Sequence, residues 1–218
     1  MSQRTLRISV LAMLLLFMGG VSAQADEIFT VRVENVSAKD ALKLSNGKTE
    51  PVAVAPVLYV IHTNRAPLFT SGEPDRGKGL EALAEDGPTG PLAESLKGQP
   101  GIVRVGSTDT PVDARNPGDI GPGDAFEFKV TAKPGERLTI AAMFVQSNDL
   151  FYAPREEGIA LFDASGKPIR GDVTSQFCSG MRAPRSTRNR ASARTKRRCN
   201  LPPTRDPPSM AWCGRSPR

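Results

Sequence analysis

Residues 28–37 show the first clear pattern of hydrophobic and polar positions. Phe29, Val31, Val33 and Val36 recur with a period close to two. That period is typical of a strand with one buried face, because successive side chains of a strand point to opposite sides. The stretch therefore predicts a half-buried strand.

Residues 51–63 are more continuously apolar and predict a second strand. Pro51 and Pro56 lie within this stretch. Since proline cannot donate a ladder hydrogen bond, we expect an edge strand or a bulge here.

Leucine and alanine at helical spacing predict two short helical turns within residues 79–98, in "LEALAEDG" and "GPLAESLKG". Gly87 and Pro88 separate them, which argues against one continuous helix. Residues 98–124 are rich in Gly, Pro and Asp, and predict a long surface loop.

A block rich in strands follows. Phe126, Phe128 and Val130 alternate strictly with polar residues. Further strands are predicted in "RLTIAAMFVQ" and "GIALFD", and "PIRGDVT" is expected to begin a return strand. Strands joined by short turns predict a mainly-β fold, an antiparallel sandwich with short helical insertions.

The N-terminus has the features of a targeting segment. Arg4 and Arg7 precede an apolar run, and Ala23-Gln24-Ala25 provides an A-x-A cleavage site. We interpret residues 1–25 as a cleaved secretory signal, with an uncleaved anchor as the alternative. The mature protein is then expected to be exported, to the periplasm or out of the cell.

Charge divides the remaining chain in two. Residues 26–176 carry 16 basic and 22 acidic residues, a formal charge of −6. Residues 177–218 carry eleven Lys and Arg residues against one acid, a formal charge of +10, and contain all three cysteines. We interpret 26–176 as an acidic domain that is stable without disulfides, and 177–218 as a disordered basic tail.

Three stretches resemble a known family: "PLFTSGE", "LEALAEDG" and "RLTIAAMFVQSNDLFYAP…GIALFD". Over residues 28–174 the chain resembles the spondin N-terminal domain family, in its stand-alone bacterial form with a signal peptide. The resemblance implies a β-sandwich similar to a C2 domain and a non-enzymatic extracellular binding role. It also implies a calcium ion at one end of the sandwich, as in the animal members.

Asp149, in "SND", matches one of the calcium ligands that the resemblance implies. Calcium requires six to eight oxygen ligands, so this carboxylate needs partners from other loops. The alternative is a turn residue, because Asp and Asn bond nearby backbone N–H groups in turns. Both interpretations of Asp149 are open.

The chain departs from the family after "GDVTSQ". The two partner acids belong to a later "WDAGTE"-like segment, and "FCSGMRAPRSTR" stands in its place. With permissible codons around Met181, the adjacent reading frame can encode WDAGTE across residues 179–185. We therefore expect that the reading frame slips near 176–178, leaving the sandwich incomplete at its C-terminal end and 177–218 out of frame.

Other candidate chemistry has simpler explanations. His62 is the only histidine, without a nucleophile motif, and is expected to be structural or at the surface. Glu156, Glu157 and Asp163 lie beside turn residues and are expected to be solvated, and the acids of 84–87 to form the polar end of a helix. The sequence contains no P-loop, no zinc-ligand spacing and no nucleophile elbow, so no motif in it indicates an enzyme.

These observations favour an exported, non-enzymatic binding module with an extracellular or envelope partner, which can be a protein, a glycan or a membrane surface. Specific nucleic-acid binding is not expected, because the basic residues follow an export signal and contain few aromatics. The alternatives are a structural envelope protein without a metal and a non-functional frameshifted product.

Overall fold

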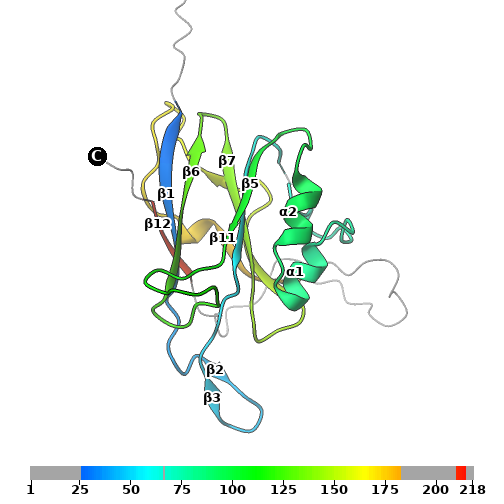
Figure 1. Ribbon diagram of the computed structural model, residues 1–218, viewed down its shortest axis with the longest axis vertical. Coiled ribbons are helices and arrows are strands. Elements are labelled where there is room, and N and C mark those ends of the chain that lie inside the picture. The colour runs from blue at the N-terminus through cyan, green and yellow to red at the C-terminus, as the bar shows by residue number, and fades with distance from the viewer. Residues whose placement is uncertain (1–25, 66, 183–209, 215–218) are drawn as a thin grey trace, which may run out of the picture.

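The computed structural model describes residues 26–65, 67–182 and 210–214, with the backbone alone in 178–182 and 210–214 (Figure 1). The expected signal segment, 1–25, lies outside the described residues. In chain order the elements are β1 (Glu27–Asn35), β2 (Leu42–Lys43), β3 (Thr49–Glu50), β4 (Val57–His62), α1 (Leu80–Asp86), α2 (Gly90–Leu96), β5 (Ile102–Thr108), β6 (Ala125–Ala132), β7 (Arg137–Met143), β8 (Leu150–Pro154), β9 (Ile159–Ala160), β10 (Gly171–Asp172), the 3-10 helix η1 (Thr174–Gln176), β11 (Phe177–Arg182) and β12 (Met210–Gly214).

Two antiparallel sheets form the body of the protein. One has the order β10-β12-β1-β6, and the other has the order β11-β8-β7-β4-β5, with β9 paired to β7. A small hairpin, β2-β3, extends from one end (Figure 1). The prediction of a mainly-β antiparallel sandwich with short helical insertions is confirmed.

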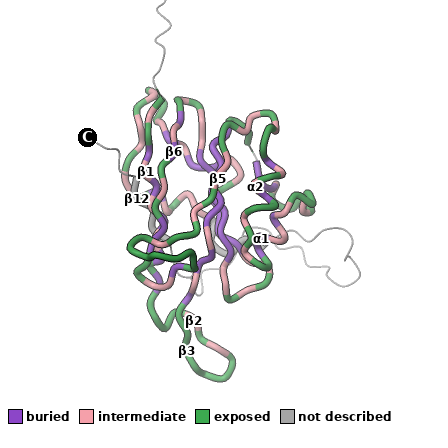
Figure 2. Tube along the Cα trace, in the orientation of Figure 1, coloured by how far each residue is buried: buried purple, intermediate pink, exposed green. Residues whose placement is uncertain are grey.

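Strand β4 is buried on both faces, which explains its continuous apolar sequence. Val57 and Ile61 pack into the core between the two sheets. Leu58 and Val60 point the other way, into a second core with the leucines of α1 and α2. Figure 2 shows the buried positions concentrated on the central strands and on the inner sides of the helices. The helices therefore form a third layer on the outer face of this sheet.

Strand β1 has the predicted alternation but ends differently. Phe29, Val31 and Val33 are buried, whereas Val36 is 42% exposed, so its predicted inward position is wrong. The buried position belongs to Asn35. Its amide nitrogen donates to the carbonyls of Val52 and Ile120, at 2.9 and 3.1 Å. The polar side chain thus joins three segments, and hydrophobic alternation alone could not reveal that role.

The predicted surface loop 98–124 is wrong for β5, which pairs with β4. As an edge strand β5 is only half covered, with Val103 and Arg104 exposed, so its sequence lacks a strong apolar pattern. Of the two alternatives for 51–63, the edge position is wrong, whereas an irregularity is present, because the β4–β5 register shifts between Ile61 and His62. Strand β4 lies between β5 and β7, and Pro51 and Pro56 precede it.

The expected disordered tail, residues 177–218, differs from the structure in two segments. Strand β11 pairs with β8, and β12 lies between β10 and β1. The sandwich therefore continues beyond the expected boundary at 176, because the open edges of β8 and β1 accept these strands. Residues 183–209 and 215–218 lie outside the described residues.

Helices α1 and α2 have seven residues each. Within the described ranges, no helix has the length and hydrophobicity needed to cross a membrane.

His62 ends β4 as a fully buried side chain, so it is structural. Its Nδ1 lies 2.6 Å from the carbonyl oxygen of Asn64, which can only accept, so Nδ1 carries the proton. Its Nε2 then accepts from the hydroxyl of Thr139 on β7, at 2.8 Å. Burial lowers the pKa of His62 below its ordinary value, and nearby Arg137 lowers it further, while the Asn64 hydrogen bond acts in the opposite direction. The neutral imidazole ties β4 to β7.

Gly158 provides the test of this close packing. It has a φ of +72°, and an added Cβ would lie 2.7 Å from both His62 Nε2 and Thr139 Oγ1. Gly135 has a similar φ of +91° but open space around it. We expect Gly158→Ala to lower the free energy of unfolding by about 3 kcal/mol, from backbone strain together with overpacking. Gly135→Ala, with strain alone, should cost about 1 kcal/mol. Urea unfolding measures both, and equal losses would contradict the packing described.

Candidate functional site

Asp149 lies in the turn that joins β7 to β8. The turn is closed by two backbone hydrogen bonds of 3.0 Å, from Phe144 N–H to Leu150 and from Ser147 N–H to Phe144. The backbone N–H of Asp149 donates to the Ser147 hydroxyl at 3.3 Å. The polar interruption between two core stretches is therefore a hairpin connection, which accounts for Ser, Asn and Asp at these positions.

Acidic partners for a calcium ion at Asp149 are not found among the described residues. Within 26–65, 67–182 and 210–214 no group of three or more His, Cys, Asp or Glu side chains is placed to hold a metal ion. Calcium takes six to eight oxygens, and charged carboxylates supply most of its affinity. The structure thus places Asp149 in a turn, and the calcium site stays a prediction.

A pocket of about 530 Å³ lies beside this turn, at the C-terminal end of β7. Three separate segments form its polar wall: the end of α1, the loop before Ile120 and the β7–β8 turn. The lining residues are Ala55, Pro56, Glu85, Asp86, Gly87, Pro88, Asp119, Met143, Val145 and Asn148. We call it the acidic pocket, because it has three carboxylates and no basic residue among its described lining.

Backbone contacts hold the three segments together. Ile120 exchanges two backbone hydrogen bonds with Val54, at 2.9 and 3.0 Å, and this bridge places the preceding Asp119. Gly87 ends α1 in the left-handed conformation, with φ 81°. Its Cα lies against the end of the sheet, because an added Cβ would be 3.5 Å from Ala55 and 3.6 Å from the sulfur of Met143. These backbone contacts therefore fix the positions of the segments that line the pocket.

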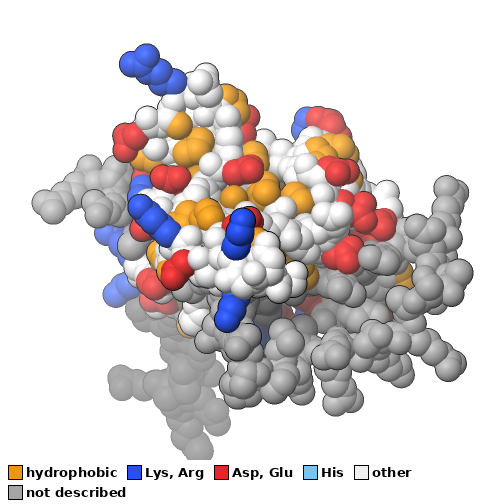
Figure 3. All heavy atoms as spheres, turned by 90° about the horizontal axis from the view of Figure 1, so that it is seen from below, with side chains coloured by type: hydrophobic (Ala, Val, Ile, Leu, Met, Phe, Trp, Pro, Cys, Tyr) orange, Lys and Arg blue, Asp and Glu red, His pale blue; other side chains and the backbone are white. Residues whose placement is uncertain are grey.

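The charges at the end of α1 oppose the local electrostatics of a helix. The C-terminal carbonyls of a helix favour cations, yet the last turn of α1 contains Glu85 and Asp86 and no basic residue. Both acids are exposed, as expected for the polar end of a short helix. Figure 3 views the molecule from this end, and shows carboxylate and hydrophobic side chains next to one another on the surface. The partial negative charge of the α1 C-terminus and the charges of Glu85 and Asp86 thus combine into a negative electrostatic potential at the pocket.

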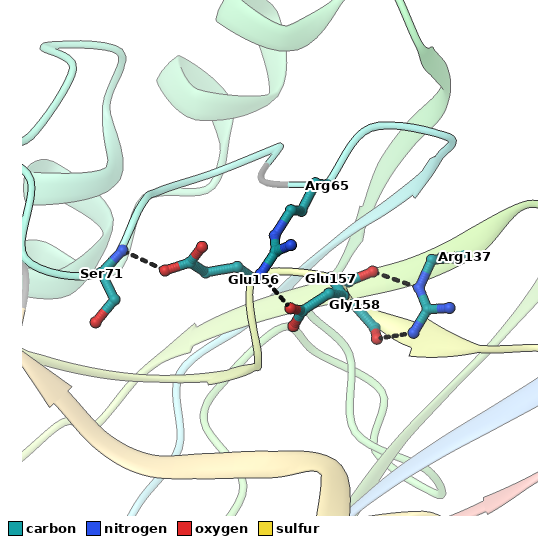
Figure 4. A network of polar contacts seen from close by, with 6 residues as sticks. All are labelled: Arg65, Ser71, Arg137, Glu156, Glu157 and Gly158. Atoms are coloured by element: carbon teal, nitrogen blue, oxygen red, sulfur yellow. Dashed lines mark hydrogen bonds and ion pairs between the residues drawn. The ribbon is translucent and has the colours of Figure 1, made fainter. Parts of the chain in front are cut away.

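Glu156 and Glu157 were predicted to be solvated, and both are partly exposed, with 43% of the Glu157 side chain accessible, but each is also engaged by another segment. The Glu156 carboxylate accepts from the backbone N–H of Ser71, and the Glu157 carboxylate pairs with Arg65 at 2.9 Å (Figure 4). These contacts tie the 155–158 turn to the loop after β4. They are long-range contacts, which turn-forming neighbours in the sequence could not reveal.

Asp163 is exposed, as predicted. It caps a local turn, accepting from the hydroxyl and backbone N–H of Ser165 and from the backbone N–H of Lys167, at 2.7 to 3.0 Å. The hydrogen bond from the Ser165 side chain is the main cause that holds the pKa of Asp163 below its usual value. These local partners give Asp163 a structural role.

The sequence did not single out the acidic pocket, because its walls come from positions far apart in the chain. One local signal was present: "AEDGP" places two acids directly before the Gly-Pro that ends a helix. A scan against protein-family models, a search of curated proteins and a search of solved structures each find no match for this chain.

Proposed function

We propose that this protein is an exported, non-enzymatic binding module of the spondin-domain type, which contacts a protein partner outside the cytoplasm through the acidic pocket. The observation that carries the proposal is the pair of carboxylates in the last turn of α1, which lie beside Asp119 and have no basic neighbour among the described residues of the pocket. Local rules that a sequence breaks without compensation indicate functional positions.

The pocket favours an extended basic segment over a single ion. Its three carboxylates do not form a group placed to hold one metal ion. They border an apolar floor that includes Met143 and Val145. Lysine and arginine side chains have apolar stems and charged ends, so they can cover such a floor and reach the carboxylates at its margin. A lysine- or arginine-rich segment of a partner protein matches both features.

Removing the two helix-terminal charges tests the proposal with two opposite effects. We expect Glu85→Gln with Asp86→Asn to raise the free energy of unfolding by about 1 kcal/mol, because the helix terminus loses two unfavourable charges. The same change should weaken binding of a ten-residue oligolysine peptide about fivefold, since two exposed ion pairs are lost. Urea unfolding and fluorescence anisotropy at low ionic strength measure the two effects.

Glu127→Gln is the matched control. Glu127 is an exposed acid on β6, outside the pocket, and should change neither quantity. All the proteins compared share the same basic residues in 177–218, so the comparison isolates the pocket. Equal oligolysine affinity in all of them would overturn the proposal and favour a structural envelope protein.

Calcium should affect the thermal stability of this chain and of a version with a corrected reading frame differently. Because the described residues hold no group of three or more His, Cys, Asp or Glu side chains placed for a metal ion, we expect calcium to leave the thermal unfolding midpoint of this chain unchanged. A version whose reading frame restores the WDAGTE segment should be stabilised by calcium, and Asp149→Asn should abolish that gain. Calcium stabilisation of the present chain that depends on Asp149 would contradict this account.

A further inference from the structure

A second pocket, of about 220 Å³, lies at the opposite end of β7 from the acidic pocket. Its lining residues are Arg137, Arg155, Glu157, Gly158, Ser175 and Gln176. They come from the start of β7, the turn after β8 and the 3-10 helix η1. We call it the arginine pocket.

Strand pairing brings these segments together. Strand β11 pairs with β8, with Phe177 opposite Pro154, so η1 comes to lie beside the turn after β8. The backbone N–H of Arg155 donates to the carbonyl of Gln176 at 3.2 Å, and that of Gly158 closes the turn on Arg155 at 2.8 Å. These backbone contacts therefore fix the backbone positions of Arg155, Ser175 and Gln176 around the pocket.

The first arginine is fixed but has no carboxylate partner. The guanidinium of Arg137 donates from Nε to the carbonyl of Glu157 and from Nη2 to that of Gly158, the latter at 2.8 Å (Figure 4). Two of its five N–H groups are used in this way, which leaves three donors. No acidic side chain of the described residues lies within ion-pair distance of Arg137.

Glu157 is the only acid among the described residues that line the pocket, and it already has a basic partner. The carboxylate of Glu157 pairs with Arg65, which does not line the pocket, at 2.9 Å. Among the described residues, Arg137 and Arg155 thus have no acidic partner in the pocket. In the described part of the chain the side chains of Arg155, Ser175 and Gln176 make no hydrogen bond or ion pair, and each has N–H or O–H groups to donate.

We propose that the arginine pocket binds a tetrahedral oxyanion, a phosphate or sulfate group of a larger ligand. A pocket of this volume is smaller than a typical site for a whole drug-sized molecule, so it suits one charged group. Two guanidinium groups, a hydroxyl and an amide offer more donors than the four lone-pair positions of a carboxylate can accept, whereas a tetrahedral oxyanion has more oxygens available. This site is independent of the acidic pocket and of the partner proposed there.

Inorganic phosphate is the probe that tests this site in the full chain. In a titration followed by NMR at constant ionic strength, the backbone amide signals of Gly158, Ser175 and Gln176 should shift and saturate. Arg155→Gln should weaken the apparent affinity about tenfold, because it removes a charge-assisted hydrogen bond. Its thermal unfolding midpoint should not change, since the Arg155 side chain is exposed and makes no hydrogen bond or ion pair within the described part.

Arg115→Gln is the matched control. Arg115 is also an exposed loop arginine without a described partner, but it lies outside the pocket. It should leave phosphate affinity unchanged. Sulfate should compete with phosphate, and acetate should bind more weakly than either. Unsaturable shifts, equal affinity in the Arg155 variant, or acetate binding as tight as phosphate would each overturn the proposal.

Discussion

The rest of the structure depends on one constraint: β4 and β7 must be buried on both faces. On one face their side chains meet β1 and β6 in the core between the sheets, and on the other they meet α1 and α2. Apolar burial stabilises by roughly 25 cal/mol per Å², so a strand covered on both sides contributes more than an edge strand of equal length. The helices are therefore needed to cover a sheet face that would otherwise be an exposed apolar surface.

Two-sided burial also determines where binding chemistry can lie. The middle of β7 has no polar surface, and its buried Thr139 is engaged by His62. Charged side chains are left at the two ends of the strand, where loops from distant parts of the chain converge. One end has carboxylates at the terminus of α1, and the other has Arg137 and Arg155. We propose opposite ligand charges for the two ends because their uncompensated charges are opposite.

Local periodicity predicted the elements that follow one simple environment. Strand β1 and strand β6 alternate because each has one buried face, and the two helices have leucines at helical spacing. Periodicity gave the wrong prediction where contacts with residues far away in the sequence determine whether a segment forms a strand or whether a side chain is buried. Strand β5 has weak alternation because it is an edge strand, and Asn35 replaces Val36 in the core because two carbonyls from other segments need its amide.

The candidate site was predictable only in part, for the same reason. The Ser-Asn-Asp sequence before Leu150 is explained by turn chemistry, which acts between neighbours. The acidic pocket combines four segments and the arginine pocket three, so strand pairing had to be known before their residues could be grouped. Likewise, the pairing of β11 with β8 and of β12 with β1 depends on open sheet edges, which composition does not encode.

His62 is the only histidine of the chain and reports directly on the buried junction of β4 and β7. The most direct measurement is an NMR titration of its ring between pH 8 and pH 5, with urea unfolding at the same pH values. The unfolded chain takes up this proton near the ordinary pKa of 6.5, and the folded chain only at lower pH. The account predicts a ring that stays neutral below pH 6.5, and a free energy of unfolding that falls as the pH drops below 6.5. A ring that titrates near 6.5 without loss of stability would contradict two-sided burial of the central strands.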